Sequence, residues 1–95
     1  MKRFSPPLDR GIKREVEILS SHGIETYESC EGGKGHSFPE PTVRFHGNAG
    51  AGWKALQVAM DHGLLIDELR IVWVMQDNAP TGPTWEMTFF RRKAP

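Results

Sequence analysis

The sequence has one cysteine, Cys30, and no long apolar run. A single thiol cannot form an intrachain disulfide, which is typical of proteins in a reducing compartment. No stretch approaches the roughly 20 apolar residues that span a bilayer, and the N-terminus has no apolar signal segment. These absences predict a cytoplasmic protein without a membrane anchor.

The chain also lacks a net charge. It has 12 Lys and Arg residues against 12 Asp and Glu residues, and the balance holds in both halves. Nucleic-acid binding depends on clustered positive charge, so a nucleic-acid partner is not expected. A net charge near zero leaves little repulsion between copies, which favours self-association.

Hydrophobic periodicity and turn residues predict two helices and four strands within the 95 residues. The predicted helices cover 5–23 and 53–63, and the predicted strands cover 24–31, 42–46, 64–76 and 84–92. This order predicts an α+β two-layer sandwich, αββαββ, in which two helices pack on one face of a four-stranded antiparallel sheet. We expect a single domain over 1–95, with 1–7 and 92–95 as flexible ends.

Side-chain alternation predicts which residues are buried. Strand 64–76 is apolar on both sides, which is typical of a central strand, and 77–83 is predicted to be a loop. Trp73 and Trp85 fall on the core-facing positions of their strands. The second helix has an apolar stripe of Trp53, Leu56, Ala59 and Met60.

The sheet face without helices is predicted to be mixed in character. Its expected residues are Tyr27, Arg44, His46, Val72, Val74, Glu86, Thr88 and Phe90. Such a face suits a homodimer interface or a ligand-binding surface, and partial solvation is the alternative.

Residues able to carry chemistry gather between 28 and 46. Cys30, His36 and His46 are possible zinc ligands, but they lack the paired spacing of known sites. Cys30 is also a possible nucleophile with a histidine as base, although neighbouring glutamates disfavour a thiolate. The alternatives are a core thiol and polar hairpin histidines.

We therefore expect any ligand site beside the loop 32–40, which would act as its lid. The candidate ligand-binding residues are Glu28, Cys30, His36, Arg44, His46 and Trp53. The glycine-rich turn 47–52 before the second helix is a further candidate, for an anion. No catalytic residue or cofactor can be named from these patterns.

The stretches ESCEGGKGH at 28–36 and FPEPTVRFHG at 38–47 resemble a set of small hypothetical proteins of phages and bacterial genomes. The resemblance covers roughly 18–90 and implies no particular activity. It favours a small intracellular accessory protein that binds a protein partner or small ligand, and a phage-encoded, host-interacting role is in keeping with the resemblance. The alternative is a small enzyme or metal-binding protein that uses a Cys/His/Arg pocket around 28–46.

Overall fold

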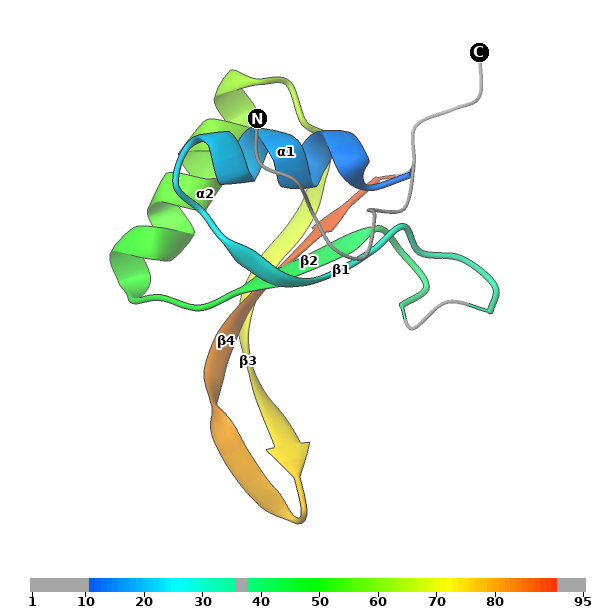
Figure 1. The fold of residues 1–95 in the computed structure, drawn as a ribbon, viewed down its shortest axis with the longest axis vertical. Coiled ribbons are helices and arrows are strands. Elements are labelled where there is room, and N and C mark those ends of the chain that lie inside the picture. Colours follow the sequence, from blue (N-terminus) through cyan, green and yellow to red (C-terminus); the bar gives the residue numbers. More distant parts are fainter. Residues whose placement is uncertain (1–10, 36–37, 91–95) are drawn as a thin grey trace.

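The computed structural model describes residues 11–35 and 38–90 (Figure 1). The predicted element order, αββαββ, is confirmed, as is the α+β class. The elements are α1 (Lys13–Ser21), β1 (Thr26–Cys30), β2 (Thr42–Phe45), α2 (Ala49–Asp61), β3 (Ile66–Gln76) and β4 (Ala79–Phe89). None of the helices in the described ranges is long and apolar enough to cross a membrane.

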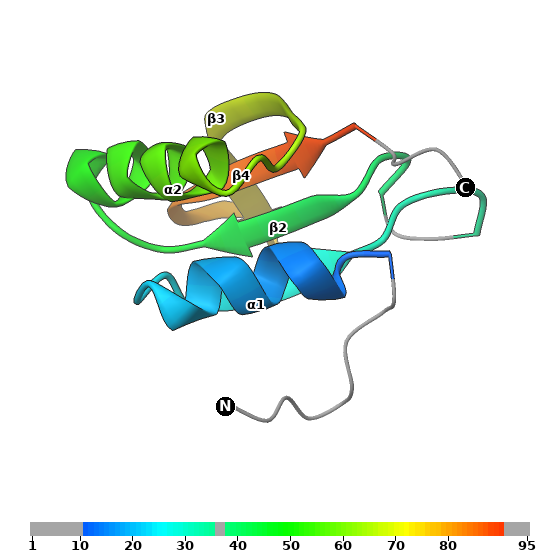
Figure 2. The same ribbon diagram turned by 90° about the horizontal axis from the view of Figure 1, so that it is seen from above.

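The four strands form one antiparallel sheet in the order β1-β2-β4-β3. Both helices lie on the same face of this sheet, with α1 over β1 and α2 toward β3 (Figure 2). The core between the layers contains Ile12, Val16, Leu19, Ile24, Val43, Phe45, Ala55, Val58, Ala59, Leu64, Met87 and Phe89. The opposite sheet face has no helical cover in the described chain.

Helix α1 begins at Lys13, later than predicted. The described residues before it form a turn, in which the Gly11 N–H donates to Glu31 Oε1 at 3.1 Å. The proposed flexible ends, 1–7 and 92–95, lie outside the described residues. At the other end, Gly23 has a φ of 85°, and the Ile24 N–H donates to the Leu19 carbonyl. This is a glycine-dependent helix ending.

Helix α2 differs from the prediction in its start and in its buried face. It begins at Ala49, inside the glycine-rich segment, because the Asn48 side chain caps it by accepting from the Ala51 N–H at 3.1 Å. The predicted stripe is wrong at Trp53 and Met60, which are exposed, whereas its Ala59 is buried. The residues that face the sheet are small, namely Gly52, Ala55, Val58 and Ala59.

Gly52 explains this choice of face. A Cβ placed there would lie 2.5 Å from the Trp85 ring, so the helix can approach the indole this closely only at glycine. Trp85 packs against the core as predicted, and its Nε1–H donates to the Asn48 carbonyl at 3.1 Å.

Strands β3 and β4 form a longer hairpin than the sequence predicted. The expected loop 77–83 is a two-residue turn, in which Asp77 and Asn78 have φ values of 51° and 63°. Asn and Asp tolerate this left-handed conformation, and two such residues match the twist of a tight hairpin. Pro80 and Pro83 lack a backbone N–H group. They are tolerated in β4 because β2 pairs only with the later part of β4, so no strand of the described chain lies beside the two prolines to require an N–H donor on that side.

The distal half of this hairpin, residues 71–84, extends beyond the two helices, as Figure 1 shows. We call this segment the arm. The structure corrects the prediction of a central third strand, because β3 lies at the edge of the sheet. Trp73 was predicted to be a core residue, and this prediction is also wrong. Its side chain lies on the same side of the sheet as the helices, but the arm extends past them, so Trp73 is 59% exposed.

Candidate functional site

A row of alternating charges crosses the open face of the sheet. One residue from each strand contributes, and strand pairing aligns them as Glu28, Arg44, Glu86 and Arg70. Arg44 donates to Glu28 Oε1 at 3.2 Å and to Glu86 Oε1 at 2.8 and 3.0 Å. Arg70 contacts the other Glu86 oxygen at 2.7 and 2.9 Å. Both Glu86 oxygens are therefore held by guanidinium groups.

Glu86 is the buried centre of this row, with only 2% of the residue exposed. Burial by itself would raise the pKa of its carboxyl group. The hydrogen bonds and positive charges of Arg70 and Arg44 outweigh this effect, so the pKa of Glu86 is lowered from its ordinary 4.5. Glu86 in turn raises the pKa of Arg70, first through the hydrogen bond and then through its charge. The carboxylate is fixed in its charged form at neutral pH.

An aromatic pair lies beside the row. The rings of Tyr27 and His46 stack with centroids 4.3 Å apart and planes 10° from parallel. The Tyr27 hydroxyl and Thr84 Oγ1 are hydrogen-bonded at 2.7 Å, and Thr84 Oγ1 also donates to the Phe45 carbonyl. These contacts tie β1 to the start of the arm.

A β-bulge in β1 explains why Tyr27 can join Glu28 on this face. Thr26 pairs with Phe45 and Glu28 with Arg44, so Tyr27 is an extra residue between two consecutive residues of β2. In a regular strand the neighbouring residues Tyr27 and Glu28 would point to opposite faces, and the bulge brings both to the open face.

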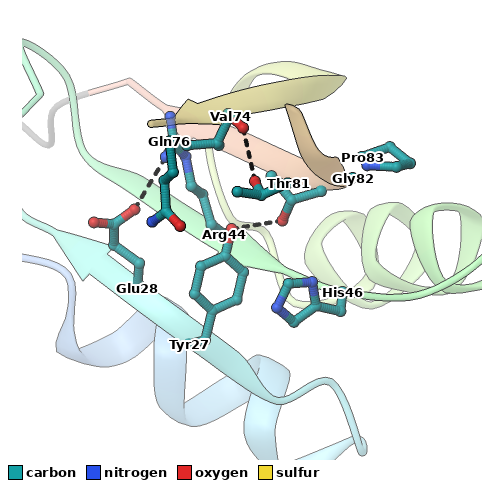
Figure 3. A pocket seen from close by; sticks show the side chains of 10 residues that line it. Tyr27, Glu28, Arg44, His46, Val74, Gln76, Thr81, Gly82 and Pro83 are labelled. Atoms are coloured by element: carbon teal, nitrogen blue, oxygen red, sulfur yellow. Dashed lines mark hydrogen bonds and ion pairs between the residues drawn. The ribbon is translucent and has the colours of Figure 1, made fainter. Parts of the chain in front are cut away.

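A hollow of about 370 Å³ opens between the aromatic pair, the charged row and the arm (Figure 3). Its lining residues are Tyr27, Glu28, Arg44, His46, Val74, Gln76, Thr81, Gly82, Pro83 and Thr84. Sequence reasoning proposed Glu28, Arg44 and His46, and the structure brings these three together. Sequence reasoning did not include Gln76 and Thr81 in the site, because it predicted that the segment after residue 76 is a loop. In the structure this segment is a strand that folds back along β3.

Hydrogen-bonding capacity remains in the hollow. Within the described chain, no hydrogen bond engages the His46 ring nitrogens or the Gln76 amide, and Glu28 uses only Oε1 toward Arg44. Arg44 is occupied on both sides, and Phe38 covers its guanidinium at 4.8 Å from the ring centroid. Free amide, imidazole and carboxylate groups thus surround the opening, while the arginine serves as a structural support.

The other sequence candidates lie elsewhere. Cys30 is buried, accepts a hydrogen bond from the Gly32 N–H at 3.4 Å and pairs with Thr42. His46 lies four residues along from Thr42, roughly 13 Å at 3.3 Å per residue. Cys30 and His46 are therefore not in contact, and His36 lies outside the described residues. No group of three or more His, Cys, Asp or Glu in the described ranges could hold a metal ion.

Trp53 does not line the hollow. It is 72% exposed on α2, and the helices lie on the opposite face of the sheet from the charged row. The N–H groups of the glycine-rich segment 47–52 are used internally at the start of α2, because those of Ala51 and Gly52 both donate to Asn48. Of the proposed lid 32–40, Phe38 reaches the charged row through Arg44.

No protein-family model, no curated protein and no solved structure gives a match to this chain. The hollow and its chemistry are therefore the basis for considering function.

Proposed function

We propose that this chain is a small binding protein and that the hollow on the open sheet face is its ligand site. The observation that carries the proposal is the convergence of the Gln76 amide, the His46 ring nitrogens and the second Glu28 oxygen around one opening. A volume of about 370 Å³ lies within the range of small-ligand pockets, which commonly combine aromatic walls with a few convergent polar groups.

The chemistry of the lining indicates the ligand class. The free Glu28 oxygen accepts hydrogen bonds, the Gln76 amide both donates and accepts, and the His46 imidazole adds two ring nitrogens that form hydrogen bonds. The Tyr27–His46 stack supplies a flat apolar wall. A small planar molecule with N–H donors, or a side chain of that chemistry on a protein partner, would match these groups. An anion is a poorer match, because Arg44 is already neutralised by two carboxylates.

The biological setting is part of the same proposal. A single cysteine, buried in the structure, suits the reducing cytoplasm. The resemblance to small phage and bacterial proteins supports an accessory, host-interacting role. The ligand would then be a molecule or a protein of the bacterial host.

Binding can be tested with a library of small heteroaromatic amides and amines, screened by saturation-transfer NMR. We expect weak hits that Gln76→Ala and His46→Ala both reduce at least tenfold in affinity. These residues are exposed, so their truncation should leave the fold intact. Trp53→Ala is the matched control, since it removes an exposed aromatic side chain outside the hollow, and its hits should be unchanged.

Two results would contradict the proposal. The first is a library without hits on the wild-type chain. The second is a set of hits that Gln76→Ala and His46→Ala leave intact, which would place binding elsewhere on the molecule.

A further inference from the structure

The outer edge of β3 is unpaired by any other strand among the described residues, because β3 ends the sheet order. Its regularity is unusual for an edge. The hairpin pairing has two bulges. One is at Asp67 in β3, and the other is in β4, where Thr81 and Gly82 together lie opposite a single residue of β3. Between Glu68 and Gln76, β3 therefore runs without a bulge of its own, so its outer edge keeps the regular spacing that a further strand needs.

The direction of the backbone groups along this edge follows from the pairing. The Phe89 N–H donates toward β2, to Pro41, and the Phe90 N–H donates toward β3, to Leu65. Alternate residues of β4 therefore serve β2 and β3 in turn, so Thr84 and Glu86 direct their groups to β3. Their partners Val72 and Arg70 face β4 in return. The intervening residues Leu69, Ile71, Trp73 and Met75 direct N–H and C=O groups away from the sheet.

The side chains at this edge are apolar and exposed. Ile71, Trp73 and Met75 are 51%, 59% and 59% exposed, although they share the core-facing side of the sheet. Residues 71–75, IVWVM, form five consecutive apolar residues without Lys, Pro or an acidic residue. Natural edge strands normally carry such protecting residues, so a long unprotected apolar edge indicates a surface that is covered by another strand.

The order of residues identifies the covering strand. Two antiparallel copies related by a two-fold axis at Trp73 would place residue 73 + n opposite residue 73 − n, and IVWVM is nearly palindromic about that point. Val72 would face the partner's Val74, Ile71 the partner's Met75, and Trp73 the partner's Trp73. Trp73 directs its backbone groups outward, so the central pair falls at a hydrogen-bonding position of the new ladder.

Neighbouring registers fit less well. An axis at Val72 would place Arg70 opposite the partner's Val74, and an axis at Ile71 would place Glu68 opposite the same residue. Both pair a charge with a valine. The axis at Trp73 alone pairs apolar with apolar through 71–75 and leaves Arg70 opposite the partner's Gln76. A strand from a different protein would not generally pair apolar residues with all of 71–75. A second copy does so, because the apolar pattern is symmetric about Trp73.

We propose that two copies of this chain associate through β3, antiparallel and centred on Trp73, to form one continuous sheet. The dimer that the sequence led us to expect therefore uses the strand edge and the exposed side chains of the arm rather than the open sheet face. The interface is independent of the ligand proposal, although it lies close to it: Gln76 lines the hollow, and the partner's Arg70 would be its cross-strand neighbour.

The test is the mass of the protein in solution, measured by size-exclusion chromatography with light scattering across the micromolar range. The wild-type chain should have twice the monomer mass. Trp73→Glu, which places two carboxylates together at the two-fold axis, should give a monomer with an unchanged far-ultraviolet circular dichroism spectrum. Trp53→Glu makes the same change at a more exposed tryptophan outside the interface and should remain dimeric.

A charge pair tests the register itself. Ile71→Glu and Met75→Lys should each weaken the dimer when alone, and an equimolar mixture should recover dimers of mixed composition, because position 71 of one copy faces position 75 of the other. A wild-type monomer, a dimeric Trp73→Glu or a monomeric Trp53→Glu would each overturn the proposal. So would a wild-type monomer whose β3 binds a different protein, or a mixture of the charged variants that gains nothing.

Discussion

Glu86 provides the sharpest test of how the charged row stabilises the fold. In Glu86→Gln, one carboxylate oxygen becomes an amide that points N–H donors at a guanidinium group, and the negative charge between Arg44 and Arg70 is lost. Hydrogen bonds to charged groups contribute about 1.5–3 kcal/mol each, and breaking a buried ion pair costs about 3–5 kcal/mol. Arg70 is more than half exposed, so its contribution is screened by water. We expect a loss of about 3 kcal/mol in the free energy of unfolding.

Urea denaturation followed by circular dichroism measures this loss. With a slope of about 1–3 kcal/mol/M for a small domain, the midpoint should fall by roughly 1–3 M. Glu68→Gln is the matched control, because Glu68 contacts the same Arg70 at 3.5 Å but is exposed. Its effect should stay below about 0.5 kcal/mol, as for other surface pairs.

The pH dependence has a definite sign. The pKa of Glu86 is lower in the folded state than its ordinary 4.5, so its stabilising effect is complete above that value. As the pH falls through the lower folded pKa, the carboxylate is protonated and the effect is lost. The stability difference between wild type and Glu86→Gln should therefore be constant near neutral pH and shrink on acidification. A variant as stable as wild type at pH 7, or a Glu68→Gln effect of equal size, would refute this account of the row.

Three further outcomes follow from the described contacts. Asn48→Ala removes the side chain that caps α2 through the Ala51 N–H and should cost about 1 kcal/mol in urea denaturation, whereas Asn48→Asp should retain most of it. Gly52→Ala places a Cβ against the Trp85 ring and should cost about 1–3 kcal/mol, with a change in tryptophan fluorescence; an unchanged midpoint would contradict the tight helix–sheet approach. Cys30 is buried and should react slowly with a thiol reagent in native buffer and rapidly in urea; rapid native labelling would show that the end of β1 is open.

The sequence predicted the element order well because the periodic patterns of helices and strands are local properties. It failed where tertiary packing decides. The close approach of α2 at Gly52 depends on the bulk of Trp85, which comes from a distant strand. A helix-wheel pattern favours large side chains such as Trp53, and nothing in the local sequence reveals that the facing position is already filled.

The candidate site was also predicted only in part, because some of its residues follow a local pattern and others depend on tertiary structure. Arg44 lies in β2 and His46 directly follows it, two residues along the chain, so their common face was accessible to simple pattern reasoning. The contribution of Gln76 required the tight turn at Asp77 and Asn78, which extends β4 back along β3. The two prolines after that turn favoured a loop. They are compatible with a strand only because β2 does not extend alongside this part of β4.

The charged row has a consequence for the register in which the strands pair. A shift of two residues between β2 and β4 would keep every side chain on its own face, and the apolar face would still meet apolar side chains such as Val43 and Met87. The open face would not tolerate it, because Glu86 would then lie opposite Thr42 or His46 instead of Arg44. The carboxylate would be buried without its cation, at a cost that a shifted pairing cannot recover. The row thus specifies a unique strand alignment, which the hydrophobic core by itself leaves open.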